Sequence, residues 1–72
     1  MRSFYHYMMR YRGNKHKDEE KQLAEWMFED HSFPKQSKSY DELSSYLEFN
    51  APFTGALSVF DRIWDTYQIE ES

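Results

Sequence analysis

Aromatic side chains are the feature that most restricts how this chain can fold. Six Phe, six Tyr and two Trp stand among only 72 residues. A chain this short has room for one layer of side chains between packed elements, and it buries about 60% of the surface that its unfolded form exposes. Each buried aromatic ring removes roughly 150–250 Å² from water, so a few rings can supply a core. We therefore expect a single domain over residues 1–72 with an aromatic core.

Cysteine is absent from the sequence. A disulfide framework, a thiolate zinc site and a cysteine nucleophile are therefore excluded, which suits a reducing compartment. No apolar run approaches the roughly 20 residues needed to cross a bilayer, and the N-terminus lacks the apolar stretch of a signal peptide. We expect a cytoplasmic protein that makes no membrane contact.

Helical spacing of apolar residues organises the first half of the chain. Ser3 can cap a helix over residues 4–11, and Gly13 with Asn14 can end it because both tolerate the left-handed backbone. A second helix is expected to begin near Asp18, since acidic side chains suit the positive end of the helix dipole. Apolar residues three and four positions apart mark the inward faces, and the predicted core positions are Phe4, Tyr7, Met8, Leu23, Trp26 and Met27.

The second half of the chain has two further helical patterns. Ser39 and Glu42 have the spacing of a capping box, in which each side chain accepts the other residue's backbone N–H. This third helix is expected to stop at residues 50–52, and Thr54 or Ser58 can cap a fourth one. The predicted core positions here are Leu43, Leu47, Phe60 and Trp64. No alternation of β-branched residues indicates a strand, so the predicted fold is all-α, an irregular array of four to five short helices.

Charge is distributed unevenly along the chain. The net charge is −4, yet residues 1–17 contain no acid, and residues 18–72 contain all thirteen acids against four bases. Four of the N-terminal cations bunch at the end of the first helix and in the loop after it, namely Arg10, Arg12, Lys15 and Lys17. These residues either contact a partner or a phosphate, or pair with the acidic remainder of the fold.

Four segments of the sequence resemble the YozE family of small proteins from low-GC Gram-positive bacteria. They are Ser3-Phe4-Tyr5-His6-Tyr7, residues 29–35 (EDHSFPK), residues 44–48 (SSYLE) and residues 60–65 (FDRIWD). The resemblance extends over essentially the whole chain. It implies a fold similar to the sterile alpha motif, built as two roughly orthogonal helical hairpins. It implies no activity, because the family is itself uncharacterised.

Catalytic, metal and cofactor patterns have little support. No two of the three histidines are closer than ten residues, whereas helical metal sites place ligands three or four residues apart. Asp61 and Asp65 lie one helical turn apart, but beside Arg62 this spacing is typical of a solvated face. Neither glycine belongs to a phosphate-binding motif. We expect no enzymatic activity, no metal and no cofactor.

Two classes of function remain, and the sequence favours a protein-protein interaction or adaptor module with an unknown protein partner. Several aromatic residues lie off the inward stripes and are candidates for an exposed patch, namely Tyr5, Phe28, Phe33, Phe49 and Phe53, with Phe33 and Phe53 favoured as core. The alternative is nucleic-acid association through Arg10, Arg12, Lys15 and Lys17. The opposite charges of the two parts of the chain also allow weak self-association, so we expect a monomer or a weak oligomer.

Overall fold

Helices account for all the regular structure in the described part of the chain. The computed structural model describes residues 1–13 and 18–71, and no strand occurs among them. The helices are α1 (Phe4–Met8), the 3₁₀ helix η1 (Met9–Arg12), α2 (Asp18–Glu29), α3 (Tyr40–Asn50) and α4 (Ala56–Glu71). The all-α fold expected from the sequence is confirmed.

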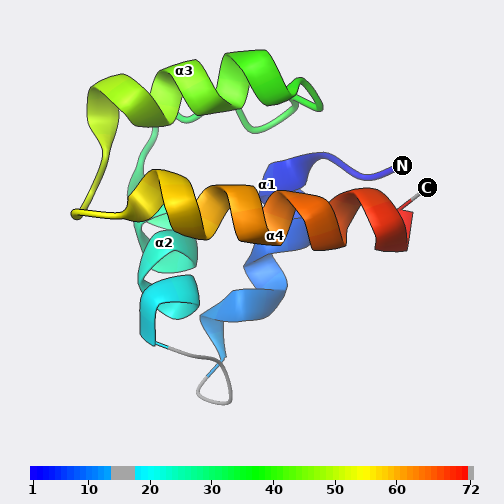
Figure 1. The fold of residues 1–72 in the computed structure, drawn as a ribbon, viewed down its shortest axis with the longest axis horizontal. Helices are drawn as coiled ribbons and strands as arrows, with labels where there is room; N and C mark the ends of the chain where they lie inside the picture. The colour runs from blue at the N-terminus through cyan, green and yellow to red at the C-terminus, as the bar shows by residue number, and fades with distance from the viewer. Residues whose placement is uncertain (14–17, 72) are drawn as a thin grey trace.

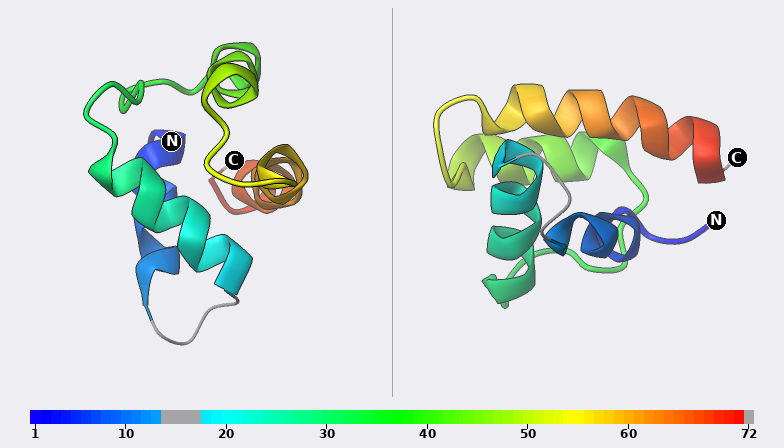
Figure 2. Two further views of the ribbon diagram at one scale, coloured as in Figure 1. Left: turned by 90° about the vertical axis from the view of Figure 1, so that its left-hand side faces the viewer. Right: turned by 90° about the horizontal axis from the view of Figure 1, so that it is seen from below.

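The helix α4 organises the arrangement because it packs against α1, α2 and α3. α3 and α4 run antiparallel as one hairpin, and the segment α1–η1 with α2 forms a second hairpin that crosses the first (Figure 1 and Figure 2). The two ends of the described chain are joined, since the Arg2 N–H donates to Glu71 Oε1 at 3.0 Å and the Tyr67 hydroxyl donates to the Arg2 carbonyl at 2.5 Å.

The first helix ends differently from the sequence-based expectation. Ser3 caps α1 as predicted, because its Oγ accepts the His6 N–H at 3.2 Å. The helix then tightens into η1 and ends at Gly13, whose φ of −76° and ψ of 162° are extended. The predicted left-handed stop at Gly13 is therefore wrong, and Asn14 lies outside the described residues.

The starts of α3 and α4 also differ in detail from the prediction. Ser39 Oγ accepts the Glu42 N–H at 3.2 Å, but the Ser39 N–H donates to Ser37 Oγ at 3.1 Å, so Glu42 does not complete the box. α4 begins at Ala56, directly after Gly55, which has a φ of +89°. This left-handed residue turns the chain into α4. The predicted cap at Thr54 or Ser58 is therefore wrong, because Gly55 directly precedes α4 and Ser58 lies within the helix.

Phe4 lies at the centre of the core. Its ring contacts Phe60, Trp64 and Tyr67 with centroid distances of 5.1, 5.4 and 5.3 Å. Eight of the ten predicted core residues are fully buried, namely Phe4, Tyr7, Met8, Leu23, Met27, Leu43, Leu47 and Phe60. The other two, Trp26 and Trp64, are only partly buried and pack against the edge of the core. An indole ring on a helix flank is too large for a single-layer core to cover completely.

Candidate functional site

The first predicted contact residue, Arg10, is bound to α4. Its Nη1 pairs with Glu70 Oε1 at 3.0 Å, and its guanidinium lies 4.0 Å from the centre of the Tyr7 ring. The Tyr7 hydroxyl donates to the same Glu70 oxygen at 2.7 Å. Burial, together with this hydrogen bond to Glu70, raises the pKa of Tyr7 well above its usual value. Arg10 therefore helps to fasten the end of α4 to α1.

The second predicted contact residue, Arg12, is bound to α2. Its Nε pairs with Glu25 Oε1 at 2.9 Å, and its guanidinium lies 3.6 Å from the centre of the Phe28 ring. This contact covers part of Phe28, one of the aromatics proposed as exposed, which remains 48% exposed. Arg10 and Arg12 thus have separate partners on separate helices. Lys15 and Lys17 lie outside the described residues.

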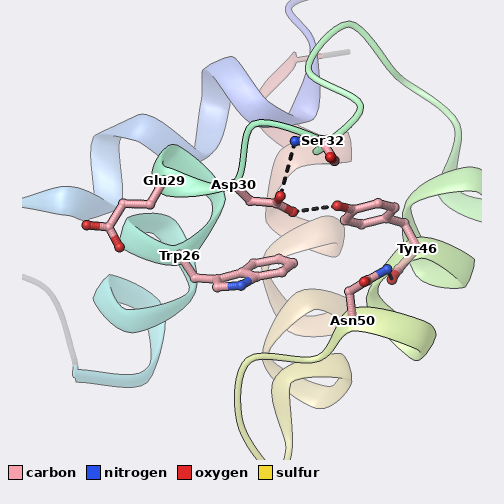
Figure 3. A pocket seen from close by; sticks show the side chains of 6 residues that line it. All are labelled: Trp26, Glu29, Asp30, Ser32, Tyr46 and Asn50. Atoms are coloured by element: carbon pink, nitrogen blue, oxygen red, sulfur yellow. Dashed lines mark hydrogen bonds between the residues drawn. The ribbon is translucent and has the colours of Figure 1, made fainter.

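A groove lies between α2 and α3 on the surface of the described residues. Its central hollow has a volume of about 440 Å³ and is lined by Trp26, Glu29, Asp30, Ser32, Tyr46 and Asn50. Figure 3 shows the Trp26 ring and the Tyr46 ring facing this space from α2 and α3. We call this surface, with the two hollows that adjoin it, the α2–α3 groove.

Two adjoining hollows extend the groove. One shares Trp26 and Glu29 with the centre and reaches Glu25 and Pro52. The other shares Tyr46, Ser32 and Asn50 with the centre and is lined in addition by Pro34, Glu42, Ser45 and Phe49. The groove therefore combines acidic side chains with large apolar ones along its whole course.

The aromatic floor of the groove rests on Phe33, the residue before Pro34. Phe33 is 3% exposed, and its ring meets Trp26 and Tyr46 edge to face with centroid distances of 6.1 and 5.5 Å. Proline biases the preceding residue toward an extended backbone, which ends the helical run before this position. Phe33 is buried, as favoured from the sequence, and its ring supports the rings of Trp26 and Tyr46.

Asp30 links the two sides of the central hollow through hydrogen bonds. Its Oδ2 accepts the Tyr46 hydroxyl at 2.5 Å, and its Oδ1 accepts the Ser32 N–H at 3.1 Å, as the dashed lines in Figure 3 mark. The hydrogen bond to Asp30, with a smaller effect from burial, raises the pKa of Tyr46 to about 12. The carboxylate is therefore held in one place between the end of α2 and the middle of α3.

Phe49 is the most exposed large apolar residue of the groove, at 86% exposure. The sequence singled it out because it lies off the inward stripe of α3. Phe33 was favoured as a core residue, and its contribution to the groove could not be read from helical spacing. Tyr5 and Phe53 pack against the core, partly buried.

Potential metal ligands are scattered over residues 1–13 and 18–71. No group of three His, Asp or Glu side chains there is placed to hold a metal ion. Asp61 Oδ1 accepts the Tyr40 hydroxyl at 2.6 Å, and this hydrogen bond raises the pKa of Tyr40. Over the same residues, no helix has the length and apolarity that a bilayer crossing requires.

Comparisons with known proteins place the fold among small bacterial proteins. A family model described as the YozE SAM-like fold matches residues 3–69. The UPF0346 protein YozE of Bacillus subtilis is 50% identical over 70 residues, which cover 97% of this chain and 95% of that protein. A UPF0346 protein of Listeria monocytogenes is 49% identical over 70 residues, covering 97% and 91%.

A solved structure is also similar to this fold. The solution NMR structure of the Bacillus subtilis UPF0346 protein YozE has a TM-score of 0.79 and 50% sequence identity, and the match covers 94% of this chain and 83% of that one. The names of these relatives state neither an activity nor a ligand.

Proposed function

The chain belongs to the YozE SAM-like family, and from the surface of its fold we propose that it is a non-enzymatic module that binds a partner protein through the α2–α3 groove. The partner contributes a short segment in which Lys or Arg stands beside a large apolar side chain. The observation that carries this proposal is the combination of exposed Phe49, the Trp26 and Tyr46 ring edges, and the fixed carboxylate of Asp30 in one continuous groove.

Apolar exposure in the groove favours a protein ligand. Scattered exposed apolar residues are ordinary, but aromatic residues gathered in a concave surface are typical of interaction sites. Phe49 projects beside Pro34 at one end, and Trp26 is shared by the centre and the other end. A partner side chain placed between them would remove apolar area from water at about 25 cal/mol per Å².

The charge of the groove selects a basic partner segment. Glu29, Asp30 and Glu42 line it, and Glu25 is already paired with Arg12. Lys21, in the hollow that reaches Pro52, is the one cation among the described residues of the lining, so acids still outnumber bases there. Each Asp30 oxygen accepts one hydrogen bond and retains a lone pair for another donor. Because Tyr46 and the Ser32 N–H already hold this carboxylate, a Lys or Arg that binds it loses little more conformational freedom on the protein's side.

The non-enzymatic part of the proposal is supported by how the polar side chains are used. Ser44 Oγ donates to the Asp41 carbonyl, and Asp61 accepts from Tyr40, so these groups serve the helix ends and the hairpin. The lack of cysteine in the sequence suits work in the cytoplasm, where we place the protein.

Nucleic-acid binding through Arg10 and Arg12 has less support. Each guanidinium already pairs with a carboxylate and lies against an aromatic ring. The neighbouring carboxylate offsets the positive charge and repels a phosphate, so a phosphate bound by the remaining N–H groups gains little.

NMR titration of the ¹⁵N-labelled protein tests the proposal. The probes are short peptides that combine Lys or Arg with Phe, Leu or Trp, together with counterparts in which Glu replaces each cation. We expect amide shifts within residues 26–34 and 42–52 with the basic peptides only. Glu29→Lys should weaken binding about tenfold or more, because it places like charges together.

Two control variants test whether a loss of binding is specific to the groove. Glu48→Lys is the control for Glu29→Lys, because it makes the same charge change at a residue of α3 that does not line the groove. Ile69→Ala is the control for Phe49→Ala, because both remove an exposed apolar side chain but Ile69 lies on α4, outside the groove. Both control variants should bind like the wild type. Equal loss in control and groove variants, shifts outside the groove, or no binding by any basic peptide would contradict the proposal. A copy of this chain as the ligand would instead appear as concentration-dependent shifts without peptide.

A further inference from the structure

A hollow separate from the α2–α3 groove lies where the N-terminal segment meets the connection between α2 and α3. Its volume is about 490 Å³, and the lining includes Arg2, Ser3, Tyr5, His6, Lys35 and Lys38. No Asp or Glu belongs to the lining, although acids outnumber bases thirteen to nine in the whole chain. We call this surface the basic hollow.

The backbone beneath the basic hollow is fixed by hydrogen bonds between its two segments. The Phe4 N–H donates to the Ser37 carbonyl at 3.3 Å, which joins residues 2–6 to residues 35–38. The Ser37 N–H in turn donates to the Pro34 carbonyl at 3.2 Å and closes a turn around Lys35. The segment that carries Arg2 and the segment that carries Lys35 and Lys38 are therefore held next to each other before any ligand arrives.

Buried aromatic residues anchor both sides of the basic hollow. Phe4 is fully buried beside Tyr5, and Phe33 is 3% exposed two residues before Lys35. The Tyr5 and Phe33 rings lie 6.0 Å apart, so they tie the two segments together below the surface. The backbone that carries the cationic side chains is thus rigidly supported from below.

The lysines of the basic hollow differ from Arg10 and Arg12, which are both paired with carboxylates of other helices. Lys35 Nζ lies 5.6 Å from the centre of the Tyr5 ring, and neither Lys35 nor Lys38 forms an ion pair with a described residue. One acid reaches the edge of the region, since Glu71 accepts the Arg2 backbone N–H. This hydrogen bond, aided by the Arg2 charge, lowers the pKa of Glu71.

We infer that the basic hollow binds phosphate groups, with Arg2, Lys35 and Lys38 as the cations and the Ser3 and His6 side chains as further polar neighbours. Phosphate fits this surface because it is a compact anion with several acceptor oxygens, which can meet separate donors from two chain segments. The inference concerns a different surface from the α2–α3 groove and does not depend on the function proposed for that groove.

The phosphate can come from a free polyphosphate or from a nucleic-acid strand, and titration of the ¹⁵N-labelled protein distinguishes the two. The probes are inorganic tripolyphosphate, a single-stranded oligothymidylate and an oligoglutamate of matched charge. We expect amide shifts at residues 2–6 and 35–38 with the phosphate probes. If the strand engages all three cations, the logarithm of its affinity should fall with a slope of about 2 against the logarithm of salt concentration.

Charge removal at single positions makes the inference falsifiable. Lys35→Gln and Lys38→Gln should each lower the salt slope by roughly 0.7 and weaken binding, whereas Arg62→Gln, a surface cation outside the lining, should do neither. A tighter complex with the oligonucleotide than with tripolyphosphate assigns a strand, and the reverse order assigns a small ligand. Oligoglutamate binding as tightly as phosphate, shifts elsewhere, or unchanged binding in both lysine variants would overturn the inference.

Discussion

Removing one hydroxyl group, by Tyr46→Phe, tests how the α2–α3 groove is held together. The variant keeps the ring contacts of Tyr46 with Phe33 and Trp26 but deletes the donor to Asp30. A hydrogen bond to a charged group contributes about 1.5–3 kcal/mol. Tyr46 and Asp30 are both only partly buried, so water can partly replace the lost donor. We therefore expect a loss of about 1–2 kcal/mol in the free energy of unfolding, or roughly 4–16 °C in Tm.

The pH dependence of this loss gives a second, independent readout. The pKa of Tyr46 is about 12 in the folded protein against 10.0 for an ordinary tyrosine. A raised folded pKa means that its stabilisation is complete below about pH 10 and is lost as pH rises through about 12. The difference in unfolding free energy between wild type and Tyr46→Phe should therefore shrink over that interval. Tyr7, whose pKa is also raised, remains in both proteins and cancels from the difference.

Urea unfolding followed by far-UV circular dichroism measures both effects, with Tyr5→Phe as the matched control. Tyr5 is also partly buried and contacts Phe33, but its hydroxyl makes no hydrogen bond to a described residue. Tyr5→Phe should leave the urea midpoint nearly unchanged. Equal stability of Tyr46→Phe and wild type at neutral pH, or a difference that persists unchanged in strong alkali, would refute the assignment of Asp30 and Tyr46 as a stabilising pair.

Four further substitutions probe the fold by urea unfolding. Gly55→Ala should cost about 1–2 kcal/mol, because an L-residue is strained at a φ of +89° although the added Cβ meets no atom within 4 Å; an unchanged midpoint would contradict this. Phe4→Ala should cost about 3–5 kcal/mol and Trp64→Ala less, because Phe4 is fully buried and Trp64 is not; the reverse order would contradict the core assignment. Arg12→Lys should cost about 0.5–1 kcal/mol, since ammonium cannot both stack on Phe28 and present a planar fork to Glu25; full stability would show that charge alone suffices.

Local chemistry explains which parts of the fold were predictable. Helix positions and most core residues follow from apolar spacing, which depends on neighbours three and four residues away. The glycines show the limit of such reasoning, because both Gly13 and Gly55 tolerate a left-handed backbone. Only Gly55 adopts it, and the path that the chain must take from α3 into α4 decides this. That path is a tertiary property which no local pattern contains.

The candidate sites were less predictable because they join distant segments. Trp26 was expected inside the core, and its place at the groove depends on how far α3 lies from α2. Asp30 meets Tyr46 sixteen residues further along the chain, and the Phe4 N–H meets Ser37 across thirty-three residues. Counting charges along the sequence placed the positive pole in residues 1–17. Folding instead brings Lys35 and Lys38 beside Arg2, while Arg10 and Arg12 turn toward acids of α4 and α2.

The side-chain chemistry of the cations matches this division. Arg10 and Arg12 each contact an aromatic face and a carboxylate at once, which a planar guanidinium can do because its flat surface stacks while its edge donates. Lys35 and Lys38 carry compact, strongly hydrated ammonium groups on flexible stems, and these lose more by leaving water for an internal pair. The same property leaves the lysine ends available at the surface. Phosphate recognition is therefore better supported at the lysines of the basic hollow than at the arginines of η1, although the arginines lie in the more basic stretch of sequence.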